Sequence, residues 1–517
     1  VEVKDEKGRL KKAIDFDQLR QELSHSVVDG HRERYRLDWP GKREALLAAN
    51  APIAKTLRAC REDSVDFDST RNLFIEGDNL DVLKLLREAY LNKVKVIYID
   101  PPYNTGNDFI YEDNFSEDTG SYFKRSYQKD EAGNRLIANT ETNGRFHSDW
   151  LTMMYSRIKL ARNLLDDDGV IFISMGEDEI DNLIKICNEI FGEENFIANF
   201  IWEKRTNREN RKVVSSRHDY IVAFCKDMSG SARVIKQLPM TEKALANYKN
   251  PDKDARGLWK SDPATAQAGH GTKSQFYVLT SPNGKEHHLQ SGRCWLYTKE
   301  VMDEAIQDGR IWFGRDGNGV PRIKTYLNAK ERGLTPETIW FASDASTNEI
   351  AKNSLKELFD GKSVFETPKP VDLIKLALLL CADDGLVLDF FAGSCATAHA
   401  AMKLNAEDKG NRKFIMVQLP EETDEGSEAF KAGYKTIANI GKERIRRAGK
   451  KIKVENADKE GIDLLDIGFR VLKVDSSNMK EVYYTPDTLN KEDLFAHADN
   501  IREDRTAEDL LFQVLLD

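Results

Sequence analysis

The chain has 517 residues and a formal net charge of −10, so it is long enough for two to four domains with sizeable cores. Its acidity excludes a global basic field, although a local basic patch is enough to bind nucleic acid. The six cysteines are scattered without a CxxC pair, which predicts a reduced, intracellular protein. The longest apolar run is far too short to cross a membrane, so we expect a soluble cytoplasmic protein with no membrane partner.

The first part of the chain predicts an α/β domain behind a charged, partly helical extension. From residue 66, "NLFIEGDN" predicts a strand and turn, "LDVLKLLREAYL" an amphipathic helix, and "VIYI" (96–99) a strand buried on both faces. A helix at 150–165, the strand "VIFISM" and a helix at 178–191 follow. This alternation of strands and helices predicts a parallel sheet.

After Trp202 the texture changes to a stretch rich in Gly, Asn, Ser, Lys and Arg, with hairpin turns such as "GRDGNGVPR". Regular α/β alternation resumes near residue 370, so an α+β domain is expected to be inserted into one split α/β domain. The expected regions are an N-terminal extension (1–65), the first half of the α/β domain (66–202), the insert (203–362), the second half (363–420) and a C-terminal segment (421–517). Because the chain begins at Val1 and stops just after an apolar run, we expect it to be a fragment.

The strand at 96–99 ends in Asp100, Pro101, Pro102 and Tyr103. Open α/β sheets place their ligands at the carboxyl ends of their strands. The prolines remove two N–H donors and leave carbonyl acceptors, while the tyrosine adds a stacking face. The group therefore offers acceptors and an aromatic surface but no nucleophile.

A second loop, in "VLDFFAGSCATAHA" (387–400), follows another buried strand and opens a helix. Small residues there let the backbone approach a ligand, and a helix N-terminus presents free N–H groups to a nucleotide or carboxylate. An ordinary tight turn would explain the loop alone equally well. In one parallel sheet, however, Asp100 and Asp389 would share an edge, so acid and loop would face one crevice.

These residues resemble amino-group DNA methyltransferases that use S-adenosylmethionine. Asp100 to Tyr103 match the family's DPPY motif, the loop at 389–397 matches its DPFxGSGTT pattern, and "ETPKP" (366–370) resembles its TxKP segment. The motif order resembles the β group. "FIEGDN", "FIMVQLPEE", "RIRRAGKKI" and "GFRVLKVDSSN" extend the resemblance to the modification subunits of type III restriction systems. The implied fold is a mostly parallel, seven-stranded methyltransferase sheet with an inserted target-recognition domain.

The resemblance implies transfer of a methyl group to N6 of a flipped adenine, without a metal. Asp100 and the carbonyl of Pro101 or Pro102 would accept the amino protons, and Tyr103 would stack on the base. An aspartate in place of the serine of the SPPY variant favours adenine over cytosine. The implied cofactor contacts are Asp78, Thr367, Lys369, Asp389, Phe391, Gly393, Ser394 and Gln418.

Two departures from the family pattern concern the cofactor. Cys395 and Ala396 stand where the pattern has Gly and Thr, and Gln418 stands where relatives have a ribose-binding acid, a role that Glu421 could fill instead. They leave open a recognition subunit that has lost catalysis, and the DPPY motif alone also leaves open a methyltransferase acting on RNA or protein.

The richest basic stretch near the insert is 202–220, which offers charge for DNA phosphates. A solvated loop is the alternative interpretation. The predicted DNA contacts are Lys204, Arg205, Arg208, Arg211, Lys212 and Arg217. The resemblance further implies a homodimer, with 1–65 and 421–517 as candidate interfaces, and a helicase-nuclease restriction subunit as partner.

Overall fold

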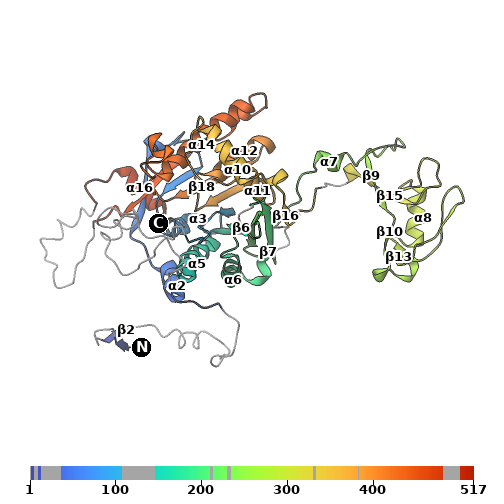
Figure 1. Ribbon diagram of the computed structural model, residues 1–517, viewed down its shortest axis with the longest axis horizontal. Coiled ribbons are helices and arrows are strands. Elements are labelled where there is room, and N and C mark those ends of the chain that lie inside the picture. The colour runs from blue at the N-terminus through green and yellow to red at the C-terminus, as the bar shows by residue number, and fades with distance from the viewer. Residues whose placement is uncertain are drawn as a thin grey trace.

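The computed structural model describes residues 2–4, 10–12, 37–106, 146–209, 213–229, 234–329, 333–381, 383–480 and 501–516. In this part of the chain a ten-stranded mixed sheet forms the centre of the molecule (Figure 1). Its strands, in spatial order, are β16 (Ile339–Trp340), β7 (Phe196–Glu203), β8 (His218–Cys225), β6 (Leu165–Met175), β5 (Val94–Ile99), β17 (Asp384–Asp389), β18 (Asn411–Gln418), β4 (Leu73–Glu76), β19 (Arg470–Ser476) and β3 (Lys55–Ala59).

The middle of the sheet is parallel from β6 to β19, whereas β8 and β3 run antiparallel to their neighbours. The expected α/β methyltransferase architecture with a mostly parallel sheet is confirmed. The described sheet has ten strands in place of the expected seven, because short strands extend both of its edges. The strand β8 lies inside the range 203–362, so the central sheet reaches into the segment that composition alone assigns to the insert.

Helices cover both faces of the sheet. One face carries α2 (Lys42–Asn50), α3 (Asn79–Tyr90), α5 (Phe146–Leu164) and α6 (Ile180–Phe191). The other carries α9 (Ala342–Ala345), α11 (Val371–Leu379), α12 (Ala396–Asp408) and α14 (Ile437–Glu455), with α10 (Asn348–Leu358) beside them. On β5, Val96 and Tyr98 pack toward the second layer while Ile97 and Ile99 pack toward the first. This period-two burial on both faces is typical of a central parallel strand, and it fixes Asp100 at the sheet's edge.

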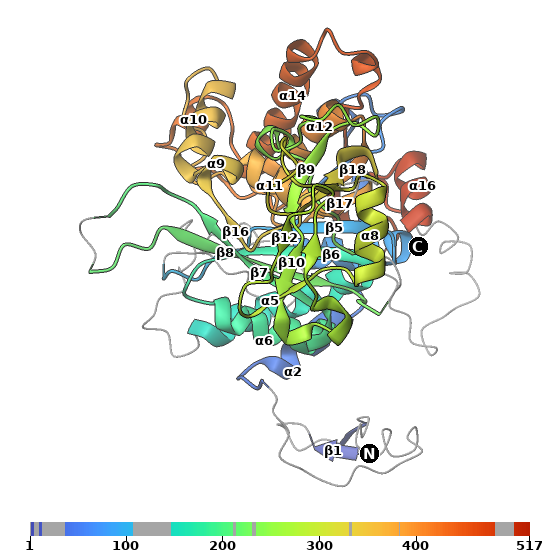
Figure 2. The ribbon, with the colours of Figure 1, turned by 90° about the vertical axis from the view of Figure 1, so that its right-hand side faces the viewer.

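The insert stands apart from the sheet (Figure 1), and Figure 2 views the molecule from the insert's side, with the insert in front of the sheet. The chain leaves after β8 and returns at β16, and Trp295, Met302 and Phe313 belong to a small apolar core of its own. Its elements are α7 (Glu242–Leu245), β9 (Trp259–Pro263), β10 (Thr265–Gln267), β11 (Leu279–Thr280), β12 (Glu286–His287), β13 (Arg293–Trp295), α8 (Lys299–Gln307), β14 (Ile311–Trp312) and β15 (Arg322–Tyr326).

Beyond the sheet, the structure describes β1 (Glu2–Lys4), β2 (Leu10–Lys12), α13 (Glu428–Lys431) and α16 (Ala507–Leu516). Ion pairs hold α16 against the β3 region: Arg58 lies 3.1 Å from Asp509, and Arg61 lies 2.8 Å from Glu508. One face of the C-terminal segment is therefore used within the chain. Among the described helices, none combines the length and apolarity that a membrane span needs.

Candidate active site

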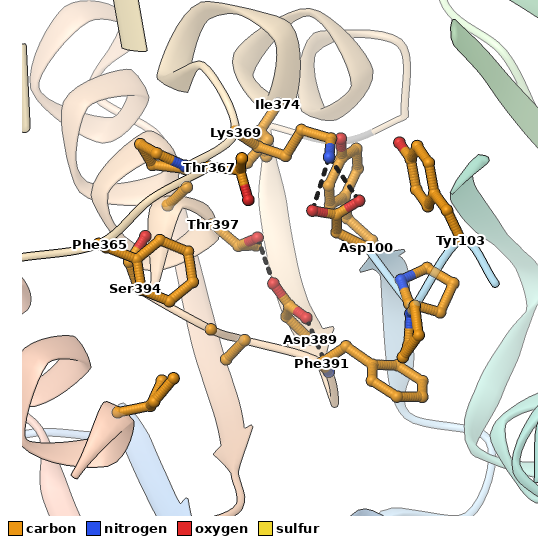
Figure 3. Close-up of a pocket in the computed structure, with 18 of the residues that line it drawn as sticks. Asp100, Tyr103, Phe365, Thr367, Lys369, Ile374, Asp389, Phe391, Ser394 and Thr397 are labelled. Carbon is orange, nitrogen blue, oxygen red and sulfur yellow. Dashed lines mark hydrogen bonds and ion pairs between the residues drawn. The ribbon is translucent and has the colours of Figure 1, made fainter. Parts of the chain in front are cut away.

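A cavity of about 480 Å³ opens at the carboxyl ends of β5 and β17 (Figure 3). The two strands pair in parallel, with Val387 opposite Val96 and Leu388 opposite Ile97. The acids that follow these pairs therefore meet at one edge, as the sequence predicts. The predicted residues that line the cavity are Asp100, Pro101, Pro102, Tyr103, Lys204, Thr367, Lys369, Asp389, Phe391, Gly393, Ser394 and Gln418.

Asp100 is paired with a lysine from the other half of the domain. The Lys369 ammonium lies 2.6 Å from Asp100 Oδ1 and 2.7 Å from Oδ2, and 4.9 Å from the centre of the Tyr103 ring. Lys369 immediately precedes Pro370, the N-cap of α11. The TxKP segment and the DPPY motif are thus joined by a direct ion pair (Figure 3), which the separate motifs do not indicate.

The two proline carbonyls, predicted as alternative acceptors, have different surroundings. The Trp150 indole N–H donates to the Pro102 carbonyl at 2.8 Å. Trp150 itself is fully buried in α5, so this bond anchors the loop to the helix layer. Pro101 is therefore the better candidate for a carbonyl that accepts a hydrogen bond from a substrate N–H beside Asp100.

The turn after Tyr103 is stabilised by the buried carboxylate of Glu179. Asn104 adopts a left-handed backbone (φ 60°) and is buried, and its amide donates to Glu179 Oε1 at 2.6 Å. His147 Nδ1 lies 2.5 Å from the same oxygen, and Asn182 donates to Glu179 Oε2 at 2.7 Å. Asparagine tolerates this backbone better than other side chains do. The cluster fixes the direction in which Tyr103 leaves the strand.

The Tyr103 ring packs against a glycine. A Cβ built on Gly176 would lie 2.9 Å from Cδ2 of Tyr103, closer than real contacts allow. Gly176 follows directly after β6, so the absence of a side chain there leaves room for the ring. Burial, together with the nearby Asp100 charge, raises the pKa of Tyr103 well above its ordinary value, so the phenol stays neutral.

Asp389 is directed into its own loop. Its Oδ1 accepts from the Phe391 N–H at 3.1 Å and its Oδ2 accepts from the Thr397 hydroxyl at 2.5 Å (Figure 3). The residue is only 3% exposed, and burial raises its pKa to about 7. These bonds give Asp389 a structural task, which is to fold the turn into α12.

Two further residues shape that turn. Gly393 has a φ of +49°, and its N–H donates to Gln418 Oε1 at 2.6 Å, while the Gln418 NH₂ donates to the Leu419 carbonyl. Both ends of the Gln418 amide are thus used within the chain. Cys395, which departs from the family's glycine, adopts the left-handed conformation (φ 61°) that glycine favours. Glu421, the alternative ribose ligand, lines the same cavity.

The lining does not include Asp78, which was predicted to contact the cofactor. Its Oδ1 accepts from the backbone N–H groups of Leu80 and Asp81, so it caps α3. The next residue, Asn79, was missed by sequence reasoning: its amide donates to the Phe390 carbonyl at 2.9 Å and supports the cofactor loop. Arg157 in turn donates to Asn79 at 2.5 Å. The available sequence signal was an arginine at an inward position of the apolar pattern of α5, and in the structure Arg157 is fully buried.

The predicted DNA contacts separate into groups. Lys204 faces the cavity and pairs with Asp219 at 2.6 Å. Arg205 lies 3.0 Å from Glu209, and Arg217 pairs with Glu203. Arg208 is exposed, and Arg211 and Lys212 lie outside the described residues. The acids beside three of these cations make the loop a surface of mixed charge.

Comparisons with known proteins all point to DNA methylases. A family model described as DNA methylase matches residues 94–429. The type III restriction-modification enzyme StyLTI Mod subunit of Salmonella typhimurium is 35% identical over 481 residues, covering 90% of this chain and 70% of that protein. The EcoP15I Mod subunit of Escherichia coli is 34% identical over 478 residues, covering 84% and 72%. A solved structure, the PvuII cytosine-N4-specific DNA methyltransferase, aligns with a TM-score of 0.34 at 14% identity, over 74% of this chain and 94% of that one.

Proposed function

This chain belongs to the DNA methylase family, and from that premise we propose that it transfers a methyl group from S-adenosylmethionine to N6 of a flipped adenine in duplex DNA. It does so as the modification subunit of a type III-like restriction system. The observation that carries the proposal is the meeting of Asp100, Lys369 and the Gly393 loop in one cavity. Acceptors for an amine and a cradle for the methyl donor are thereby within reach of each other.

The residues present fit S-adenosylmethionine. The turn at Gly393 brings bare backbone to the cavity wall, where a Cβ would lie only 3.4 Å from the Phe365 ring. Thr367 and Lys369 offer a hydroxyl and an ammonium for a carboxylate on the same wall. When bound, S-adenosylmethionine supplies an electrophilic methyl group. Asp389 and Gln418 act indirectly, because their hydrogen bonds hold the turn in shape.

The chain's part in the reaction is to orient a weak nucleophile. The lone pair of an adenine amine is delocalised into the ring, so the amine attacks only after it is pyramidalised. Asp100 accepts a hydrogen bond from one amino N–H and the Pro101 carbonyl accepts one from the other, which directs the lone pair toward the methyl donor. Tyr103, held over Gly176, stacks on the flipped base. An aspartate in the DPPY motif favours adenine N6 over cytosine N4.

The decisive experiment measures transfer of labelled methyl groups to long mixed-sequence duplex DNA, followed by digestion to nucleosides. We expect label in N6-methyladenine with the wild type and none with Asp100→Ala. Asp68→Ala is the matched control, because Asp68 is also ion-paired but lies 85% exposed. RNA of the same sequence serves as competitor. Label in N4-methylcytosine or in RNA would contradict the proposal, and cofactor binding without any transfer would favour a recognition subunit that has lost catalysis.

We also propose that the subunit forms a homodimer and associates with a restriction subunit. The association with a restriction subunit is supported by the similarity to Mod subunits of restriction-modification enzymes over most of the chain. The exposed side chain of Leu511 on α16 offers apolar surface for such a contact. Sedimentation of the full chain should give twice the mass of one chain, and Leu511→Glu should lower it. A monomer at micromolar concentration would contradict the dimer.

A further inference from the structure

A second acid–lysine pair lines the same cavity as the Asp100–Lys369 pair. Lys204 Nζ lies 2.6 Å from Asp219 Oδ1, and both residues line the cavity. Lys204 follows the end of β7, and Asp219 lies near the start of β8, opposite Trp202 in the strand register. The pair therefore sits on the antiparallel edge of the sheet, while Asp100 sits on its parallel centre.

Lys204 is held too tightly for a general phosphate contact. Its side chain is 19% exposed and that of Asp219 is 5% exposed. Its backbone is fixed as well, because the Lys204 N–H donates to the Arg217 carbonyl and its own carbonyl accepts from the Asn348 N–H, both at 3.0 Å. An ammonium neutralised by a neighbouring carboxylate and aimed into a cavity is poorly placed to meet the backbone of a duplex.

The charges of the two pairs act on each other. Burial raises the pKa of Asp219, and the Lys204 ammonium opposes that rise most strongly. Lys369 also lowers the pKa of Asp219, whereas Asp100 raises it. Asp219 contributes to the raised pKa of Tyr103 as well. These interactions place the pair in the same electrostatic cluster as the groups that would receive the base.

We propose that Lys204 donates a hydrogen bond to a ring nitrogen that flanks the amino group of the flipped adenine, and that Asp219 is the positioning residue that aims it. This inference rests on the proposed function. Adenine presents a donor at N6 beside acceptors at N1 and N7. Acceptors at Asp100 and Pro101 next to a donor at Lys204 match that pattern. Guanine and thymine carry a carbonyl in place of the amine and an N–H at the neighbouring ring position, so the same cavity rejects them.

The test uses duplexes whose target adenine, first located by modification-sensitive sequencing, is replaced by 1-deazaadenine or 7-deazaadenine. For Lys204→Met on unmodified DNA, we expect kcat/KM to fall roughly 10- to 100-fold, as for loss of one hydrogen bond from a charged donor. One of the two analogues should cost the wild type a similar factor and cost Lys204→Met almost nothing further. Asp219→Asn keeps an acceptor for Lys204 and should give a smaller loss with the same analogue preference.

Because Lys204→Met leaves a buried carboxylate without its partner, a second variant combines it with Asp219→Asn. The double variant carries no stranded charge and should show the same insensitivity to the analogue. The inference is wrong if the wild type tolerates both analogues, or if the variants discriminate between adenine and the analogues as the wild type does. It is also wrong if Lys204→Met only weakens DNA binding with a shallower salt dependence, or only weakens S-adenosylmethionine binding in calorimetry. Failure of the wild type to methylate adenine at all would instead overturn the proposed function.

Discussion

Asp100 and Asp389 end neighbouring parallel strands, yet their surroundings give them different tasks. Both oxygens of Asp389 accept hydrogen bonds from its own loop, and the residue is 3% exposed. Asp100 is held instead by the ammonium of Lys369, and its carboxylate faces the cavity. An aspartate whose acceptors are occupied by backbone and hydroxyl donors builds structure. An aspartate that faces a cavity beside a cation remains able to accept a hydrogen bond from a substrate N–H.

The difference between the two acids is tested most directly by neutralising Asp100. Asp100→Asn should lower kcat by about 10²- to 10³-fold, since it replaces the carboxylate, whose negative charge stabilises the positive charge that develops on the attacking amine, with a neutral amide. Its unfolding midpoint in denaturant should stay close to that of the wild type, because Asp100 borders a cavity. Single-turnover methyl transfer and urea unfolding provide the two readouts. A large loss of stability with a modest loss of rate would show that Asp100, like Asp389, serves mainly to stabilise the fold.

The rate of methyl transfer should also depend on the position of the Tyr103 ring. Gly176→Ala introduces a Cβ 2.9 Å from the Tyr103 ring, so the ring must shift. A displacement of about 1 Å near reacting atoms costs up to about 10²-fold in rate. Gly269→Ala is the matched control, since a Cβ there meets nothing within 4 Å. Equal rates for the two variants would show that the position of Tyr103 does not matter.

On the structural side, Thr397→Val removes the hydroxyl that donates to Asp389 Oδ2. Leaving a buried acceptor without its donor should cost about 1–3 kcal/mol in the free energy of unfolding. Affinity for S-adenosylmethionine should fall with it, because the Gly393 turn loosens. Denaturant unfolding and calorimetry measure the two effects, with Thr280→Val at an exposed strand position as control. Unchanged stability would mean that the Asp389 bond contributes nothing to the loop.

The last effect concerns pH. Burial raises the pKa of Asp389 from an ordinary value of 3.8 to about 7. Between these values the folded state binds more protons than the unfolded state, so this group's contribution to stability is present below pH 3.8 and is lost as pH rises through 7. Asp389→Asn imitates the neutral acid and should remove that decline. Unfolding curves at pH 5, 6, 7 and 8 test it, and parallel pH dependences for wild type and variant would contradict it.

Sequence patterns predicted those parts of the site that the parallel sheet positions. Buried strands ending at Asp100 and Asp389 had to share an edge, because parallel strands present their carboxyl ends together. This inference needs only local periodicity and the geometry of the βαβ unit. Cys395 was noted as unusual because the family pattern has glycine there, and the structure shows that its backbone adopts the conformation that glycine favours.

The rest depends on contacts between distant segments. Nothing in the TxKP segment indicates that Lys369 reaches Asp100, and nothing in α5 indicates that Trp150 binds the Pro102 carbonyl. Asp78 was predicted as a cofactor ligand and caps α3 in the structure, because a capping residue and a ligand-binding acid look alike in sequence at the start of a helix. Lys204 was read as part of a charge run, and only the pairing of β7 with β8 reveals Asp219 beside it.

The attachment of the insert has an evolutionary consequence. The chain departs after β8 and returns at β16, and both strands lie on the side of β6 away from β5 and β17, the strands that lead to Asp100 and Asp389. The insert also has a core of its own. If it reads DNA, recombination between two related genes at these crossings would exchange one recognition cassette for another. A lineage could thus acquire a new target sequence in a single genetic event while inheriting its chemistry unchanged.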